Sequence, residues 1–398
     1  MRKTGFRALL TIGIALLCTH INAQERDDRA TILNFKGIQF TSKDSLFYTN
    51  FRFRMQNRVK YTNTLDGEKN DEWEARVRRL RMRVDGYIYT PKISYSVQLA
   101  FTRGDQDFDD SGIPNIVRDA VIFYNFSDDF YIGFGQNKLP GNRQRVNSSG
   151  QLQFAERSIV NANFSIDRDF GISANLSKKI GDMPFNLKAE ISTGEGRAVN
   201  TTDNGLAYTG RVELLPFGQF TNSGDYSEGD LEREETPKLS IGGGYSFNNK
   251  TTRLSGQTGA FVKDAKDLST LFTDAIFKYN GFAYQVEYMK RNVDNPFNQD
   301  LEGKEVYVYK GYGINQQISY LFSKGYELAG RYTFVDPHKD IRPKEERTEI
   351  LEAGLTKYMK AHRLKFQLNG NYLVKDGYYN NKMDDNKWGF TFQVELGI

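Results

Sequence analysis

The chain has 398 residues and is rich in strand-forming aromatics, with 29 Phe and 23 Tyr but only nine Pro. Its 54 basic and 50 acidic residues give a formal net charge of +4. This near balance excludes a strongly basic nucleic-acid-binding protein, and we expect no nucleic-acid partner. The mean hydropathy of −0.61 does not exclude a membrane barrel, because lumen and loop residues mask the lipid-facing half of its strands.

The N-terminus predicts export. Three basic residues precede a mostly apolar stretch: Arg2, Lys3 and Arg7 lie before residues 8–17. Ile21-Asn22-Ala23 then suits a signal peptidase, so residues 1–23 are expected to be a cleaved signal peptide. A periplasmic lead segment over 24–46 and one barrel domain over 47–398 would follow. The single cysteine, Cys18, lies within the predicted signal, so we expect a mature chain without disulfides, as suits a bacterial envelope protein.

Loss of the predicted signal would lower the net charge from +4 to +1. Any preference for anions must then come from where the charges lie, and not from the total.

The first barrel strand is predicted over residues 47–61. Successive side chains of a strand point to opposite faces. One face is apolar, with Phe47, Phe51, Phe53, Met55, Val59 and Tyr61. The other face is polar and basic, with Arg52, Arg54, Gln56, Arg58 and Lys60.

The stretch 76–89 repeats this pattern with a sharper contrast. Leu80, Met82, Val84 and Ile88 share one face, and Arg79, Arg81, Arg83 and Asp85 share the other. An arginine that faces lipid at the midplane costs about 2–4 kcal/mol, so these arginines must face water or a partner. A soluble secreted sandwich would expose the basic face to solvent, whereas a membrane barrel would turn it toward a water-filled lumen.

The rest of the chain alternates short turns with longer loops. Short turns are predicted at 127–129, 280–281, 323–325 and 360–362, and longer loops near 103–116, 138–167, 194–204, 248–268, 292–305, 336–347 and 375–386. The connection 216–237 is long where a short turn is expected. This pattern predicts an all-β, up-and-down antiparallel transmembrane β-barrel of about 16 strands, with both termini in the periplasm.

The last strand favours the barrel over the sandwich. Trp388, Phe390, Phe392, Val394, Leu396 and Ile398 alternate with small and polar residues up to the final position. An unpaired apolar edge of this kind is prone to aggregation in a soluble protein, whereas a barrel pairs it with its first strand.

Four stretches taken in order resemble the phosphate-selective porins of the O and P type: Arg78–Gly86, Arg118–Tyr124, Gly133–Gln136 and Phe154–Ser158. The resemblance implies a sixteen-stranded barrel in the bacterial outer membrane, usually a homotrimer. It also implies that the third outer loop, here 138–167, folds inward and narrows the pore. The candidate constriction residues are Lys138, Arg143, Arg145 and Arg157.

The resemblance further implies a ladder of arginines on the channel wall. Arg79, Arg81 and Arg83 match its motif, and alternation adds Arg52, Arg54, Arg58, Lys60 and Arg331 as candidate anion-path residues. No lysine cluster matches the family's phosphate site, and acidic residues fall on predicted lumen faces at Asp119, Glu190, Glu287 and Glu327. We therefore expect a general bias toward small anions rather than tight phosphate selectivity.

Each of these features has a structural alternative. The wall arginines would merely stabilise the barrel if they pair with Asp85, Asp119 or Glu287, and the loop cations would be solvated or act as tethers. The acidic stretch 105–112 lacks the glycine and the final acidic residue of an EF-hand, so a solvated loop is expected and no metal site. Neither histidine outside the predicted signal, His338 or His362, has a triad-like setting, so no enzyme and no cofactor are expected.

The sequence thus predicts an outer-membrane porin, a passive channel with a basic lumen that favours small anions such as phosphate. Its partners would be membrane lipid and anionic solutes. The alternative is a structural or ligand-binding outer-membrane barrel that acts through its outer loops.

Overall fold

In a computed structural model of the chain, the structure describes residues 31–34, 37–65, 71–108, 112, 114–197, 199, 205–375 and 386–398. The predicted signal peptide lies outside the described residues. Within the described part, no helix has the length and apolarity that crossing a membrane requires.

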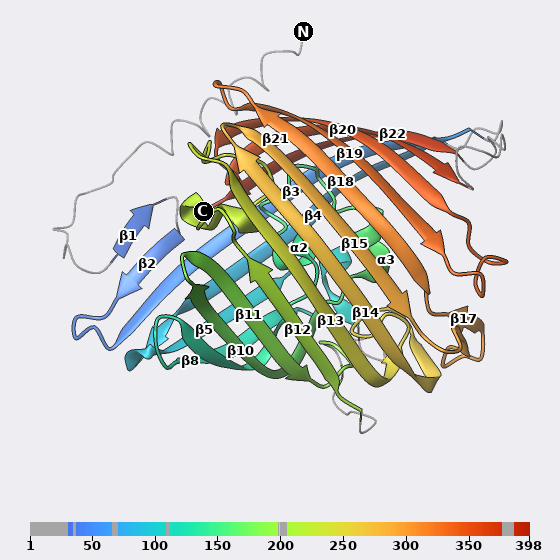
Figure 1. Cartoon of the computed structure of the whole chain (residues 1–398), viewed down its shortest axis with the longest axis horizontal. Coiled ribbons are helices and arrows are strands. Elements are labelled where there is room, and N and C mark those ends of the chain that lie inside the picture. The colour runs from blue at the N-terminus through green and yellow to red at the C-terminus, as the bar shows by residue number, and fades with distance from the viewer. Residues whose placement is uncertain are drawn as a thin grey trace, which may run out of the picture.

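Sixteen antiparallel strands among the described residues form a closed ring (Figure 1). They are β3 (Phe47–Thr64), β4 (Asp71–Ile88), β5 (Thr90–Ala100), β8 (Val117–Asn125), β9 (Phe130–Lys138), β10 (Arg168–Ile180), β11 (Met183–Ser192), β12 (Ala207–Leu214), β13 (Lys238–Arg253), β14 (Phe261–Tyr279), β15 (Phe282–Asn292), β18 (Gly311–Leu321), β19 (Tyr326–Pro337), β20 (Thr348–Lys360), β21 (Leu364–Lys375) and β22 (Lys387–Gly397). Each pairs with the next, and β22 returns to β3 through pairs such as Gln393 with Arg58. The predicted sixteen-stranded barrel is confirmed.

The lead segment contains two strands that its polar sequence did not predict. Strand β1 (Thr31–Asn34) pairs with β2 (Gly37–Thr41), and β2 pairs with the first residues of β3. Strand β22 pairs with β3 only from Arg54 onward, so β2 occupies the part of the β3 edge that β22 leaves free. The hairpin extends away from the ring at one end (Figure 1).

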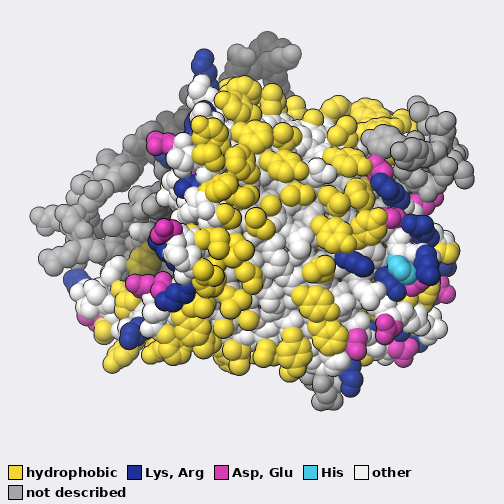
Figure 2. Space-filling view, in the orientation of Figure 1, with side chains coloured by type: hydrophobic (Ala, Val, Ile, Leu, Met, Phe, Trp, Pro, Cys, Tyr) yellow, Lys and Arg dark blue, Asp and Glu magenta, His cyan; other side chains and the backbone are white. Residues whose placement is uncertain are grey.

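The outer face of the ring is hydrophobic. In β22, Phe390 and Phe392 are 52% and 46% exposed, whereas the alternate residues Gln393 and Glu395 are 1% exposed. Figure 2 shows the hydrophobic side chains as a broad belt over the strands, with charged side chains gathered toward the two ends. This is the apolar band that a barrel presents to lipid, and it is the reverse of a soluble sandwich.

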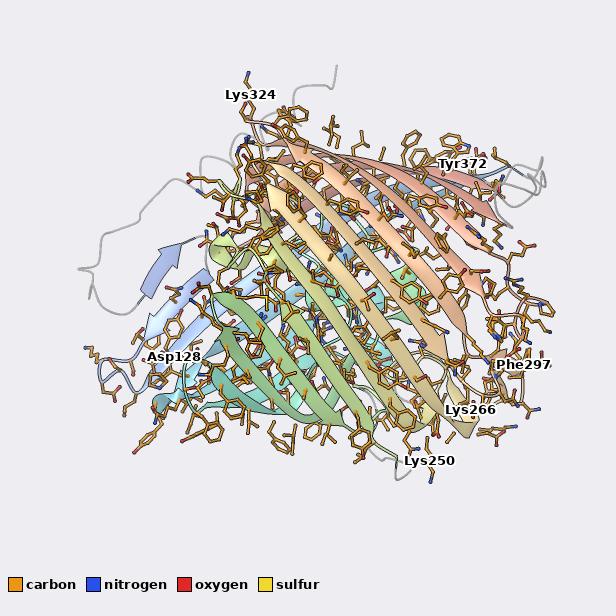
Figure 3. All side chains as sticks on the ribbon, in the orientation of Figure 1. Asp128, Lys250, Lys266, Phe297, Lys324 and Tyr372 are labelled. Atoms are coloured by element: carbon orange, nitrogen blue, oxygen red, sulfur yellow. The ribbon has the colours of Figure 1, made fainter. Side chains whose placement is uncertain are left out.

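The two ends of the barrel differ in their connections. Strand pairs at the turn end are joined by residues such as 181–182 and 280–281, and at the loop end by longer stretches such as 293–310. Lys324 and Asp128 lie at the turn end, and Lys250, Lys266 and Phe297 lie at the loop end (Figure 3). Short turns are periplasmic in such barrels. The predicted loop 248–268 is shorter than expected, because β13 continues to Arg253 and β14 begins at Phe261.

Three further elements belong to the loops. A 3₁₀ turn, η1 (Arg103–Asp105), precedes the short pair β6 (Asp107–Phe108) and β7 (Pro114–Asn115), and a second short pair joins β16 (Phe297–Gln299) to β17 (Glu305–Tyr307).

The 139–167 loop packs against the inward faces of the strands. It contains α2 (Arg143–Val146) and α3 (Ile159–Phe164). Its apolar residues Leu139, Val160, Phe164 and Ile166 form a buried cluster with Phe272 of β14, Met289 of β15 and Val335 of β19. Since all three strand residues lie on the face opposite the lipid belt, an apolar cluster fastens the loop inside the ring.

A second long connection occupies the turn end. The 215–237 turn joins β12 to β13 and contains the 3₁₀ segment η2 (Thr221–Tyr226). Its Leu215 and Phe220 are buried against Ile276 of β14.

Candidate functional site

The basic residues of β3 and β4 are brought together by a β-bulge. Gln56 pairs with Arg79 but Asn57 pairs with Val77, so Arg78 has no direct partner on β3. A bulge places two successive residues opposite one and re-aims a side chain. Arg78 and Arg79 therefore both reach the same carboxylate, that of Glu156 in the 139–167 loop.

Glu156 is the centre of an arginine cluster. Its carboxylate accepts hydrogen bonds from Arg58, Arg78 and Arg79, with 3.0 Å from Arg79 Nη2 to Oε2. Its backbone oxygen accepts another from Arg331 Nη1 at 3.0 Å. Burial raises the pKa of Glu156, but the guanidinium groups of Arg79, Arg78 and Arg58 outweigh that effect and hold the pKa well below its usual range. The carboxylate therefore stays ionised and neutralises part of the predicted ladder.

Arg81 is engaged by a second loop carboxylate, Asp105 of η1, and donates to Ser149 Oγ at 2.9 Å. Burial raises the pKa of Asp105, but Arg81 and Arg118 hold it well below its usual range. Asp105 belongs to the stretch 105–112, of which Asp109 to Ser111 lie outside the described residues. Among the described residues, no cluster of three metal-ligating side chains occurs.

The other cations predicted for the channel wall have different partners, which depend on their positions along the strands. Arg52 and Arg83 share Asp85, the partner expected of the structural alternative, with 3.3 Å from Arg83 Nε to Asp85 Oδ1. Arg54 donates to Ser149 Oγ at 2.7 Å. Lys60 lies opposite Glu74 and Thr391. Arg331, besides its bond to the backbone oxygen of Glu156, pairs with Glu352 and stacks on Phe154.

The four predicted cations of the loop have two different roles. Arg143 is fully buried and donates to Asp274 Oδ1 at 2.9 Å and to Ser240 Oγ at 2.8 Å, so it tethers the loop to the wall. Arg145 pairs with Asp167. Lys138 donates to the carbonyl of Val146 at 3.0 Å and also to the carbonyl of Asn147. Arg157 donates to the same Asn147 carbonyl at 2.9 Å.

Lys138 and Arg157 differ from the paired cations, because their hydrogen bonds go to backbone carbonyls. Within the described part of the chain, neither has a carboxylate oxygen within 4.0 Å. Burial lowers the pKa of Arg157 well below its ordinary value, and Arg145 and Arg79 lower it further, because like charges disfavour one another. Their carbonyl partners leave the net positive charge in place.

Both cations line a cavity of about 410 Å³ between the loop and the wall. Its basic lining residues are Arg81, Arg83, Arg118, Lys138, Arg145, Arg157, Arg168 and Lys188, and its acidic ones are Asp119 and Glu190. A second cavity of about 170 Å³ shares Arg81 and Arg83 and adds Arg52, Arg54, Arg363 and Glu395. The charged residues that line these two cavities are thus mainly cations.

Among the inward cations that sequence reasoning missed, three are instructive: Arg78 bonds to Glu156, and Arg118 and Arg168 line the cavity of about 410 Å³. Strict alternation places Arg78 and Arg118 on the lipid face. A second bulge, where Gln98 pairs with Asp119 and Leu99 with Val117, turns Arg118 inward. Pairs of adjacent charged residues within a membrane strand were the signal, because one of the two would otherwise face lipid at a cost of about 2–4 kcal/mol. The third, Arg168, begins β10 and pairs with Asp119 at 2.7 Å.

The comparisons with known proteins agree on the architecture. An uncharacterized protein of Aquifex aeolicus (strain VF5) is 22% identical over 389 residues, covering 87% of this chain and 86% of that protein. The anion-selective porin from Comamonas acidovorans superposes with a TM-score of 0.55 at 10% identity, covering 88% of this chain and 100% of that one. The trimer form of OmpT, an outer-membrane protein of Vibrio cholerae, superposes with a TM-score of 0.52 at 12% identity, covering 88% and 99%.

At these identities the solved structures show the fold alone. The family model described as phosphate-selective porin O and P matches residues 49–395, which include nearly all of the barrel. The closed ring, its apolar belt and this match place the protein in the bacterial outer membrane as a channel-type barrel. The chain belongs to the phosphate-selective porin O and P family.

Proposed function

We propose that this porin is a passive diffusion channel whose open path favours small anions, phosphate among them. The observation that carries the proposal is the cavity beside the 139–167 loop. Eight cations and two carboxylates line it, and Lys138 and Arg157 have no carboxylate partner among the described residues. Because guanidinium groups stay charged, the cavity keeps a positive potential that attracts anions.

The arrangement suits conduction rather than storage. A permeant ion must bind well enough to enter and weakly enough to leave, which several shared sites allow. Arg81 and Arg83 line both cavities, so an anion can pass from one to the other while it remains beside a guanidinium group. Asp105, Asp85 and Glu156 neutralise several neighbouring arginines, and this reduces the chance of a single trapping site.

The 139–167 loop is proposed as the constriction, with Lys138 and Arg157 facing the path and Arg143 holding the loop in place. Two features favour a general anion path over a tight phosphate site. Asp119 and Glu190 face the same cavity, and only Lys138 and Lys188 supply lysines there. The family description and the name of the Comamonas acidovorans porin support an anion as the solute. The trimer form of the Vibrio cholerae protein supports a homotrimer.

Addition of phosphate to single channels conducting chloride tests the solute class. If phosphate occupies the cavity, millimolar phosphate at constant ionic strength should reduce the chloride current. As a control, the same ionic strength is supplied by the chloride salt of a bulky organic cation in place of phosphate, and the chloride current should then not be reduced. An unchanged current in phosphate leaves a general anion path, whereas a protein that forms no conducting pore at all would favour a barrel that acts through its outer loops.

A further inference from the structure

The 215–237 turn breaks the pattern of short connections at the periplasmic end and folds into the ring instead of projecting from it. Lys278 of β14, which is 2% exposed, donates through Nζ to the carbonyls of Gly224 at 2.7 Å and Ser227 at 2.9 Å. It also donates to the carbonyl of Gly229. One buried wall cation therefore holds three backbone oxygens of the turn.

The turn is joined to the 139–167 loop by buried hydrogen bonds. Glu228 is 1% exposed and accepts from Gln144 Nε2 at 3.0 Å and from the backbone nitrogen of Gln153 at 2.9 Å. Gln317 of β18 also donates to Glu228, at 3.1 Å. Arg143 of the loop donates to the backbone oxygen of Asp225 at 3.2 Å. The two inward segments form one hydrogen-bonded body.

This body lies over a sector of the lumen that is rich in acid. The buried carboxylates of the wall there are Glu213, Asp274, Glu287 and Glu327, the turn itself adds Asp225, Glu228, Asp230 and Glu234, and the buried cations are Arg143, Arg211, Lys278, Arg291 and Arg331. The cavity of about 410 Å³ lies instead against β4, β5 and β8 to β11, reaches the turn at Tyr226, and has eight cations and two carboxylates in its lining. Counted with the turn, this acidic sector has more buried carboxylates than cations, whereas the lining of the 410 Å³ cavity has more cations than carboxylates. A cavity of about 320 Å³ remains beside the turn, and its charged lining residues are Glu232, Lys278 and Arg363.

We infer that the 215–237 turn is a selectivity element that closes the acidic sector of the lumen to ions. A sixteen-stranded ring is wide enough to leave an aqueous channel across its section. With the acidic sector filled, ions are confined to the basic side, so the turn would set both the conductance and the sign of selectivity. The inference rests on the proposed anion path for its selectivity readout, and its conductance readout is independent of that path.

Replacement of residues 217–236 by Asn-Gly, which forms a two-residue hairpin, tests the inference. Full-length protein carrying this change should keep the heat-modifiable gel mobility of a closed barrel. Because the part of the lumen that the turn occupies is freed, single-channel conductance should rise above the wild-type value, and the preference for chloride over potassium should fall. A closed barrel with unchanged conductance would overturn the inference.

Point variants decide the matter if the shortened chain does not fold. Glu228→Ala removes the acceptor shared by Gln144, Gln153 and Gln317, and should produce a larger conductance level. Glu235→Ala makes the same chemical change at an exposed position of the turn and should leave conductance unchanged. Equal conductance in the two variants would refute the role of the turn. If instead the wild-type channel prefers cations, the proposed function fails while the conductance test still reports on the turn.

Discussion

Arg157→Gln probes the charge that the protein leaves uncompensated. Among the described residues, Arg157 donates to the carbonyls of Gln144 and Asn147 and to no carboxylate, so its replacement strands no carboxylate there. Glutamine keeps a donor for one of the two carbonyls. The variant should therefore fold like the wild type and lose one positive charge from the cavity.

The size of the effect follows from Coulomb's law. A unit charge about 4 Å from an anion contributes about 1 kcal/mol in bulk water and about 4 kcal/mol at an effective dielectric constant of about 20. At about 0.1 M salt the screening length is about 10 Å, so most of this attraction survives at contact. With the value for water, the stability of an anion beside this position should fall about fivefold, because about 1.4 kcal/mol corresponds to a factor of ten. The anion-to-cation permeability ratio should fall by at least this factor, because the cation is no longer repelled.

The assay is the reversal potential of single channels across a KCl gradient. Arg342→Gln is the matched control, because Arg342 is 60% exposed in an outer loop and pairs with Asp336 away from the cavity. If Arg157→Gln leaves the permeability ratio at the wild-type value, or if Arg342→Gln lowers it equally, the cavity is not the selectivity site.

Four further predictions follow from the same contacts. Glu156→Gln releases three arginines from their shared carboxylate and should increase anion preference in the reversal-potential assay; a decrease would contradict the assignment. Arg143→Met removes one of the two arginines that contact Asp274 and Glu213, and Arg211 stays beside both carboxylates. It should therefore lower the unfolding free energy, measured by urea titration in detergent or lipid, by less than the value of about 3–5 kcal/mol that a wholly unpaired buried charge costs. Phe392→Arg should cost about 2–4 kcal/mol in the same titration because it faces lipid, whereas Thr391→Arg, on the inward face, should cost less. The pKa values of Glu156 and Asp105 are held well below their usual ranges, so both carboxylates stay ionised at every pH above their lowered pKa. Ion selectivity should therefore stay constant from about pH 8 to about pH 5. A change of selectivity within that range would show that another group controls the path.

The wall of the barrel was predictable because its strands obey a local rule. Lipid outside and water inside impose a period of two on every strand, and β22 shows it without interruption. The rule failed where a bulge inserts one residue, at Arg78 and at Arg118, since alternation carries no information about register shifts. It also failed for β1 and β2, whose pairing depends on the free edge of β3 rather than on an apolar face of their own.

The partners of the wall arginines were not predictable from their own strands. Glu156 and Asp105 come from loops far away in the sequence, and hydrogen-bond geometry across the lumen selects them. The expected partner Asp85 engages Arg52 and Arg83, but Glu287 instead accepts from the backbone nitrogen of Gln144 at 2.6 Å. Charge counts along strands therefore locate a basic wall and leave open how much of its charge remains unpaired.

The reversal potential of the wild-type channel across a KCl gradient tests the central claim most directly. That claim is that the cavity beside the 139–167 loop has more cations than carboxylates in its lining, and that Lys138 and Arg157 of that lining have no carboxylate partner among the described residues. We expect a potential of the sign that marks chloride as the more permeant ion, reduced by Arg157→Gln and untouched by Arg342→Gln. A potential of the opposite sign, with potassium preferred in the intact protein, would contradict the account.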